Sequence, residues 1–138
     1  MINDDKAKIV NDRFYDAFNK RDIEAMKQVW GSDDKATCVH PGWPPLIGFY
    51  PILNSWADIF KNSGNMEIQI ADVRVLASED LAWVSCTERL FTIAENGVLV
   101  SQVFATNLFY PEGDDWKMLM HHASPSPATE EIDDASKN

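Results

Sequence analysis

A short segment, residues 38–48, holds the side chains best suited to chemistry in this chain. It sets His40 and Trp43 among three prolines and two glycines, between a strand-like run and a helix-like run. An imidazole with its ordinary pKa of about 6.5 is the natural proton shuttle at neutral pH. Pro41 biases the residue before it toward extended backbone, which fixes the direction of His40. The segment therefore indicates a histidine that contacts a ligand or transfers protons, or one that only bonds a backbone carbonyl at a pocket rim.

Two long strands, predicted at residues 81–93 and 98–110, carry the next candidates. Side chains alternate along a strand, so Cys86 and Glu88 share one face, and Arg89 lies on the other. A carboxyl group inside a partly apolar cavity has a raised pKa and can serve as an acid or a base. The alternative is an ion pair of the Glu88–Arg89 type at the surface or across strands, and alternation alone does not choose between the two.

The composition is that of one globular domain. The chain has 138 residues, of which 45% are hydrophobic, and a formal net charge of −10. This balance argues against a nucleic-acid binder, which needs a basic stripe, and against docking on an anionic membrane. No signal-peptide pattern and no bilayer-length apolar run occurs, so we expect a cytoplasmic location. Cys38 and Cys86 are then expected as buried free thiols, with a disulfide between them as the minor alternative.

Apolar spacing predicts three helices in the first half of the chain. The first begins near Asp4 or Asp5, and Asp22 caps a short second helix, which gives an antiparallel helical hairpin. A third helix has Pro51 at its first position and stops at residues 63–65. These helices precede all but one short strand of the predicted sheet.

After the third helix the apolar period changes to two, which is typical of strands. The phase flips at Ala71-Asp72, which indicates a β-bulge. The pair Asn96-Gly97 predicts a tight hairpin between the two long strands, and the last strand is expected at residues 116–123.

The order of these elements predicts an α+β fold class. Three N-terminal helices are expected to pack on a strongly curved, mainly antiparallel sheet, so that helices and sheet form a cone open at one end. We expect a single domain at residues 1–125. Residues 126–138, which are acidic and begin within the Ser-Pro repeat of residues 124–127, are expected to be a mobile tail.

Five stretches resemble the SnoaL-like branch of the nuclear-transport-factor-2-like (cystatin-like) superfamily: residues 12–22, residues 40–43, Gly48, residues 55–56 and residues 116–124. The resemblance covers roughly residues 5–125. Members of the superfamily include ketosteroid isomerases, polyketide cyclases, dehydratases, transport factors and association domains of calmodulin-dependent kinases. The resemblance implies an apolar pocket inside the cone, and it does not by itself imply an activity.

Comparison with the ketosteroid isomerases argues against steroid isomerisation. Their oxyanion-donor tyrosine falls on Phe14, and their aspartate base falls on His40. No counterpart of their second oxyanion acid is evident. Tyr15, next to the substituted position, would replace the missing donor only if the helix were rotated.

The resemblance also sorts the faces of the strands. By analogy with the kinase association domains, Cys86 and Asn107 point into the pocket. Family alignment favours His122 inward and His121 toward the outer face. A metal site of His40, His122 and Glu88 would use good ligand types, but the histidines lack any i, i+4 spacing, so no metal is expected.

The tryptophans divide into three groups. Helical spacing predicts Trp30 and Trp56 as core residues, whereas Trp43 on its Pro-rich turn is placed to line a pocket mouth. Trp83 and Trp116 are expected on the convex face of the sheet. An exposed aromatic sheet face is usually buried against another surface, and in this superfamily that surface is often a second subunit. We therefore expect a homodimer through the outer sheet face.

Together these features predict a pocket protein for a small apolar molecule, without a cofactor. If it is an enzyme, it is a cofactor-independent isomerase or lyase that catalyses isomerisation, dehydration or cyclisation by proton transfer. The alternative is a ligand-binding or homo-oligomeric association module without catalysis. The expected catalytic residues are His40, Glu88 and His122, and the expected substrate-binding residues are Tyr15, Phe18, Trp43, Trp56, Cys86 and Asn107.

Overall fold

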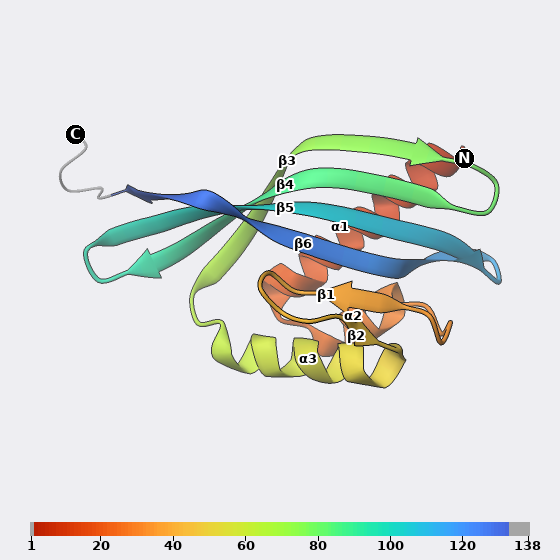
Figure 1. The fold of residues 1–138 in the computed structure, drawn as a ribbon, viewed down its shortest axis with the longest axis horizontal. Helices are drawn as coiled ribbons and strands as arrows, with labels where there is room; N and C mark the ends of the chain where they lie inside the picture. The colour runs from red at the N-terminus through yellow and green to blue at the C-terminus, as the bar shows by residue number, and fades with distance from the viewer. Residues whose placement is uncertain (1, 133–138) are drawn as a thin grey trace.

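A computed structural model describes residues 2–132, and the side chains of residues 2–127 (Figure 1). The helices are α1 (Asn3–Lys20), α2 (Ile23–Val29) and α3 (Phe49–Asn62). The strands are β1 (Thr37–Val39), β2 (Leu46–Ile47), β3 (Met66–Ala77), β4 (Ala82–Ala94), β5 (Gly97–Glu112) and β6 (Asp115–Ile132).

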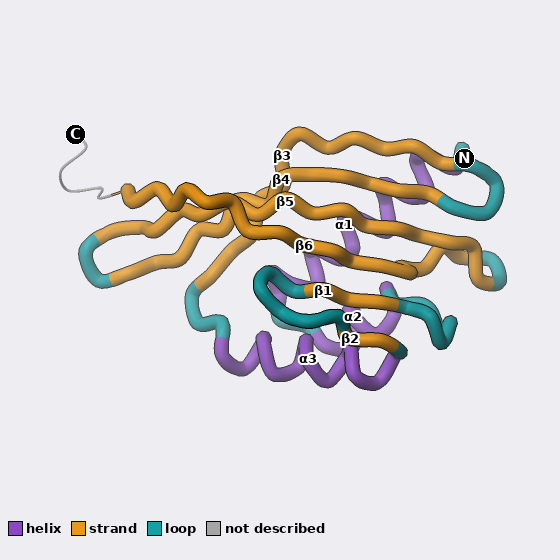
Figure 2. Tube along the Cα trace, in the orientation of Figure 1, coloured by secondary structure: helices purple, strands orange, loops and turns teal. Residues whose placement is uncertain are grey.

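The strands form one sheet in the order β2-β1-β6-β5-β4-β3. The four long strands are antiparallel to their neighbours, whereas β1 runs parallel to β6 and pairs with residues 120–122. Figure 2 shows this sheet as a long twisted layer with the helices gathered along one side and one edge. The predicted α+β cone, with three helices on a curved and mainly antiparallel sheet, is confirmed.

Helix α1 closes the concave side of the sheet. In Figure 1 it crosses behind the long strands, and it contacts β3, β4 and β6. Its buried face carries Phe14, Tyr15 and Phe18, which pack against Trp56 of α3 and the inner faces of the strands. None of the helices in the described part of the chain combines the length and the apolar character needed to cross a membrane.

The predicted bulge in β3 is confirmed. The pairing of β3 with β4 slips between Ala71 and Arg74, and Asp72 adopts a positive φ of 53°. A bulge of this kind increases the local twist and bends the strand. Here it lets β3 follow the curve of the sheet around α1.

Two predicted helix starts need adjustment. Asp22 caps α2 as expected, since its carboxylate accepts a hydrogen bond from the Ala25 backbone N–H at 3.0 Å. Helix α3, however, begins at Phe49, two residues before Pro51, after Gly48 with a φ of 97°. The Asp4 carboxylate accepts from the Ala77 backbone N–H at 3.1 Å, so it ties α1 to β3 rather than capping its own helix.

The last strand is longer than predicted. It does not end at Ala123 but continues to Ile132, with Pro125 opposite Val103 and Ile132 opposite Val98. Because β1 pairs only with residues 120–122, the far side of β6 is a free edge among the described strands after that point. A proline on an edge strand interrupts no ladder on its open side. The expected mobile tail therefore begins inside a strand, and its residues 133–138 lie outside the described residues.

Candidate active site

An apolar cavity of about 240 Å³ lies inside the cone. It is enclosed by α1, α3, the strands β3 to β5 and the turn that follows β1. Its lining consists of Phe14, Phe18, His40, Pro41, Trp43, Trp56, Ile59, Met66, Ile68, Glu88, Leu90 and Val103. Five of the nine residues predicted for the site therefore line one cavity, and three others lie directly behind Glu88.

Glu88 is the acidic residue of this lining. It comes from β4 between the apolar partners Ile70 of β3 and Val103 of β5, and it is 4% exposed. Burial raises the pKa of its carboxyl group to about 7, although a hydrogen bond from Tyr15 acts in the opposite direction. The group therefore exists in both protonation states near neutral pH, which suits an acid–base catalyst.

The alternative of a surface ion pair for Glu88 is wrong. Arg89 points to the opposite face of β4, where its guanidinium lies over the Phe91 ring at 5.3 Å from the ring centre. None of the ion pairs among the described residues includes Glu88.

A buried chain of hydrogen bonds supports Glu88 from behind. The Tyr15 hydroxyl donates to Glu88 Oε2 at 2.7 Å and accepts from Asn107 Nδ2 at 3.1 Å. Asn107 Nδ2 also donates to Asn11 Oδ1 at 2.8 Å, and Asn107 Oδ1 lies 2.6 Å from His121 Nδ1. Because the Tyr15 oxygen already accepts a hydrogen bond from Asn107, its own O–H is directed at the Glu88 carboxylate.

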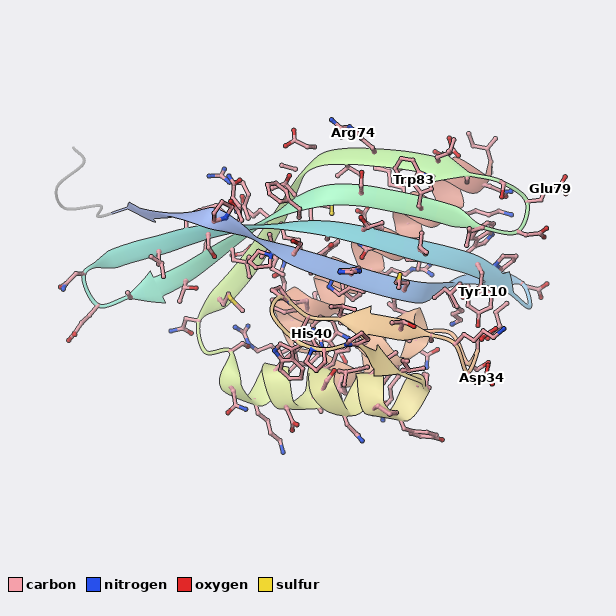
Figure 3. The ribbon with its side chains drawn as sticks, in the orientation of Figure 1. Asp34, His40, Arg74, Glu79, Trp83 and Tyr110 are labelled. Carbon is pink, nitrogen blue, oxygen red and sulfur yellow. The ribbon has the colours of Figure 1, made fainter. Side chains whose placement is uncertain are left out.

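His40 forms part of the opposite wall, between β1 and α3 (Figure 3). Its Nε2 lies 2.8 Å from Ser55 Oγ, and the Ser55 hydroxyl donates to the Ile52 carbonyl at 2.6 Å. Since the Ser55 hydroxyl proton is used in the bond to Ile52, His40 Nε2–H must be the donor to Ser55 Oγ, which leaves Nδ1 as an acceptor. Burial lowers the pKa of His40 to about 4. The ring is therefore neutral at pH 7, and it offers a lone pair rather than a positive charge.

The expectation for the two adjacent histidines is wrong. His121 points into the cone, is 2% exposed and lies 4.8 Å from the Phe14 ring, whereas His122 is exposed on the outer face. Directly paired residues of neighbouring strands point to the same side, and His121 pairs with Asn107. His122 is therefore not part of the cavity. Burial is the main cause that lowers the pKa of His121 to about 3, so its ring is also neutral.

The aromatic predictions are confirmed except for one. Trp30 and Trp56 are buried, and Trp43 is 45% exposed at the edge of the cavity. Trp83 lies on the convex face, in front of the sheet in Figure 3, whereas α1 crosses behind it. Trp116 was expected on that face but is 7% exposed and belongs to the core.

The two cysteines are buried free thiols, as predicted, so the disulfide alternative is wrong. Burial raises the pKa of Cys86 to about 11 and also raises the pKa of Cys38, so neither thiol is a nucleophile at neutral pH. Cys86 Sγ lies 3.4 Å from the Tyr15 hydroxyl, which places it behind Glu88. Among the side chains of residues 2–127, no three His, Cys, Asp or Glu are grouped as metal ligands would be.

The sequence was compared with models of known protein families. The model of the SnoaL-like domain matches residues 8–129, which is most of the chain. The chain belongs to the SnoaL-like family. The resemblance read from the sequence is thereby confirmed, and the cavity described above is the interior of a SnoaL-like cone.

Relatives of this SnoaL-like chain include two solved structures of similar length. A candidate dehydratase of the NTF2-like family from Streptomyces avermitilis is 34% identical with a TM-score of 0.81, over 91% of this chain and 96% of its own. A candidate calcium/calmodulin-dependent protein kinase type II association domain from Thiobacillus denitrificans is 33% identical with a TM-score of 0.79, over 86% of this chain and 94% of its own.

Among curated proteins, the F-box protein SKIP8 of Arabidopsis thaliana is 27% identical over 115 residues. The matched segment is 83% of this chain but 47% of the plant protein, so the chain spans about half the length of that relative.

Sequence reasoning missed two members of the site. Asn11 and His121 complete the hydrogen-bond chain behind Glu88, and neither was among the predicted site residues. A signal for Asn11 was available, because it stands between Val10 and Phe14 on the otherwise apolar face of α1. A polar side chain in such a stripe requires a buried partner.

Proposed function

We propose that the cavity binds a small apolar organic molecule and that Glu88 moves protons to and from it. The observation that carries this proposal is a buried carboxyl group with a pKa of about 7 that faces an apolar cavity. Proton transfer of this kind serves isomerisation, dehydration and cyclisation, and none of these reactions requires a cofactor.

Each neighbouring group has a distinct part in this proposal. His40 Nδ1 accepts a hydrogen bond from the ligand, and Phe18, Trp43 and Trp56 supply apolar walls. Tyr15, with Asn107 and Cys86 behind it, is a positioning residue that holds the Glu88 carboxylate toward the cavity. His122 has no part in it, because it is exposed on the other face.

The volume limits the size of the ligand. An engineered cavity of about 150 Å³ holds one benzene molecule. The present cavity, about 240 Å³, has room for one substituted ring or two small fused rings. A four-ring steroid is too large, which agrees with the missing isomerase groups at Phe14.

The proposal predicts carbon-acid exchange that depends on Glu88. In heavy water, the protein is expected to introduce deuterium next to the carbonyl of single-ring ketones, and mass spectrometry would measure the incorporation. Glu88→Gln should lower the rate by 10² to 10⁴, the usual contribution of a general acid or base. The rate should rise with pH through about 7, because the ionised carboxylate is the base.

Two further variants make this test specific. His40→Ala should weaken ketone binding, whereas Glu67→Gln, which alters an exposed carboxylate on the outer side of β3, should change nothing. If no ketone of a broad panel exchanges above the rate of the Glu88→Gln protein, proton-transfer catalysis is excluded for this substrate class.

A second candidate function is homo-oligomeric association through the outer sheet face. Phe104 is 51% exposed and Leu76 is 59% exposed on that face, and Leu76 is paired with the half-buried Trp83. Phe104 is paired with Thr87, four residues along β4 from Trp83, so exposed apolar side chains occur on β3, β4 and β5 of this face with polar residues between them. The candidate kinase association domain at 33% identity supports this proposal.

We expect the protein to sediment as a dimer at micromolar concentration and Phe104→Glu to sediment as a monomer. A charge at the centre of an apolar interface costs several kcal/mol unless it is paired, which is enough to separate the subunits. Tyr50→Glu is the matched control, because Tyr50 is 77% exposed but lies on α3. A wild-type protein that sediments as a monomer at 100 times that concentration would rule out association through this face.

A further inference from the structure

We infer that the ligand of this cavity is a small organic cation, a protonated amine whose ammonium group lies against Glu88 and whose apolar body lies against the aromatic walls. The inference rests on the proposed function, since it presupposes that the cavity binds a small molecule. It adds the chemical class of that molecule. Three features of the cavity support it: the aromatic rings of its wall, the absence of positive charge, and the lack of a cationic partner for the Glu88 carboxylate.

The cavity wall consists largely of aromatic rings. Phe14, Phe18, Trp43 and Trp56 all contribute to the lining, and His40 adds a fifth ring. Trp56 packs edge-on against Phe14 at 5.4 Å and against Phe18 at 5.9 Å between ring centres, so the rings are held in fixed orientations. Ring faces attract cations, and indole does so most strongly, with energies of about 2 kcal/mol or more at desolvated sites.

The charges near the cavity are negative or absent. Glu88 is the one acidic side chain in the lining, and the lining contains no lysine or arginine. The other titratable groups around Glu88 come from α1, β1, the turn after β1, β4 and β6, and they are Tyr15, Cys38, His40, Cys86 and His121. Both histidines are neutral at pH 7 because burial lowers their pKa values. The cavity therefore offers no positive charge to an anion.

Glu88 lacks a cationic partner among the side chains of residues 2–127. The causes of its pKa shift are burial and the Tyr15 hydrogen bond, without a contribution from any positive group. A buried carboxylate without a cationic partner is unfavourable, and an opposite charge within about 4–6 Å stabilises it. A ligand ammonium supplies that charge, and the net charge of −10 favours the approach of cations to the protein.

An ion pair formed in a cavity also has a cost, because the ammonium group loses its water. The aromatic walls offset that cost by replacing water with ring faces. Neutral ligands avoid the cost but gain neither the ion pair nor the ring–cation attraction. We therefore expect the cation to bind at least tenfold tighter than a neutral ligand of the same shape once Glu88 is ionised.

Three probes of nearly equal size test the inference: benzylamine, benzyl alcohol and benzoate. Their dissociation constants would be measured at pH 8 by calorimetry and by NMR shifts of the Trp56 indole signal. Benzylamine, which is protonated at this pH, should bind at least tenfold tighter than benzyl alcohol, and benzoate should bind weakest. The affinity for benzylamine should also fall at least tenfold between pH 8 and pH 5.5, because Glu88 takes up a proton in this range. The affinity for benzyl alcohol should not change.

Two variants assign any preference to Glu88. Glu88→Gln should remove the preference for benzylamine and leave the affinity for benzyl alcohol within about threefold. Glu67→Gln removes one negative charge at an exposed position and should leave all three affinities unchanged.

The outcomes separate this inference from the function on which it rests. If benzyl alcohol binds as tightly as benzylamine at pH 8, the cation inference is wrong and the small-molecule pocket stands. If benzylamine keeps its advantage in Glu88→Gln, the cation binds elsewhere and the inference is also wrong. If none of the three probes shifts the Trp56 signal at millimolar concentration, both the inference and the pocket proposal fail.

Discussion

The effect of Glu88→Gln on the free energy of unfolding is expected to be roughly 2 to 3 kcal/mol more favourable at pH 8 than at pH 5. The pKa of Glu88 is raised from 4.5 to about 7 in the folded protein. Between these values the folded state binds more protons than the unfolded state, so the free energy of unfolding falls as pH rises. Each pH unit contributes about 1.4 kcal/mol, and the loss is complete above about pH 7. Glutamine has no charge and escapes this loss.

The experiment compares wild type and Glu88→Gln by urea unfolding from pH 5 to pH 8. His40 and His121 act in the opposite direction, because their pKa values are lowered to about 4 and about 3, and acid therefore destabilises the folded state below about pH 6.5. Both histidines are present in both proteins, so their contribution cancels in the difference. Glu67→Gln serves as the control and should show a difference that does not change with pH.

A difference that stays within about 0.5 kcal/mol across this range would mean that Glu88 is not buried as an ionised group at pH 8. The expected result has a functional meaning as well. A residue that lowers stability at neutral pH has no structural reason to be there, and such residues are typical of ligand-binding and catalytic sites.

Alternation along strands and the family resemblance together predicted the part of the candidate site that lies on β4. Because the period of a strand is two, Glu88 and Cys86 were placed on the same face, and the analogy with the kinase association domains assigned that face to the pocket. The bulge in β3 was also visible, since the apolar residues Ile68 and Ile70 change phase before Val73. At the bulge, the pattern of polar and apolar residues changes at the position where the backbone changes.

Which side chains of β6 point into the cone was not predictable in this way. Its pairing with β5 slips so that Leu108 faces Met120 and Phe109 faces Met118, which leaves Leu119 as an extra residue. The slip changes the phase of the strand. Because residues 118–120 are all apolar, the sequence shows no sign of this change. Trp116 on one side of the slip and His121 on the other therefore both point inward, although they are an odd number of residues apart.

The end of β6 was hidden for a different reason. Two prolines spaced by one residue, Pro125 and Pro127, normally end a strand, because proline cannot donate to a ladder. They are accommodated here because the strand has become an edge at that point, which depends on how far β1 extends beside it. The pairing with β5 also slips between Pro125 and Thr129, and Pro127 lies within that slip. The end of β6 thus depends on pairing between strands distant in the sequence, which local sequence does not show.

The second large effect concerns Asn107. Replacing it by leucine, a side chain of similar size, is expected to lower the free energy of unfolding by about 4 kcal/mol. The substitution leaves two buried groups without their partner, Asn11 Oδ1 and His121 Nδ1. It also removes one hydrogen bond of the Tyr15 hydroxyl, which keeps its bond to Glu88. Each buried polar group that loses its partner costs about 1 to 3 kcal/mol, and Asn107 is fully buried, so water cannot replace it.

Urea unfolding at pH 7 would measure this loss, with Thr106→Val as the control on the same strand. Thr106 is exposed and points to the outer face, so its substitution should cost no more than about 0.5 kcal/mol. A double-mutant cycle makes the test specific to the network. Asn11→Leu should cost at least about 1 kcal/mol less when Asn107 is already leucine, because their hydrogen bond is then absent. Additive costs would show that the two residues stabilise the protein independently.

The same substitution also bears on the chemistry proposed for the cavity. The Asn107 amide donates a hydrogen bond to the Tyr15 oxygen and so directs the Tyr15 O–H to Glu88. Without that amide the tyrosine hydroxyl is free to rotate, and the folded fraction of Asn107→Leu should show a higher pKa for Glu88. The pH at which ketone exchange reaches half its maximum should then move upward. A loss of stability without that movement would make Asn107 a structural residue only.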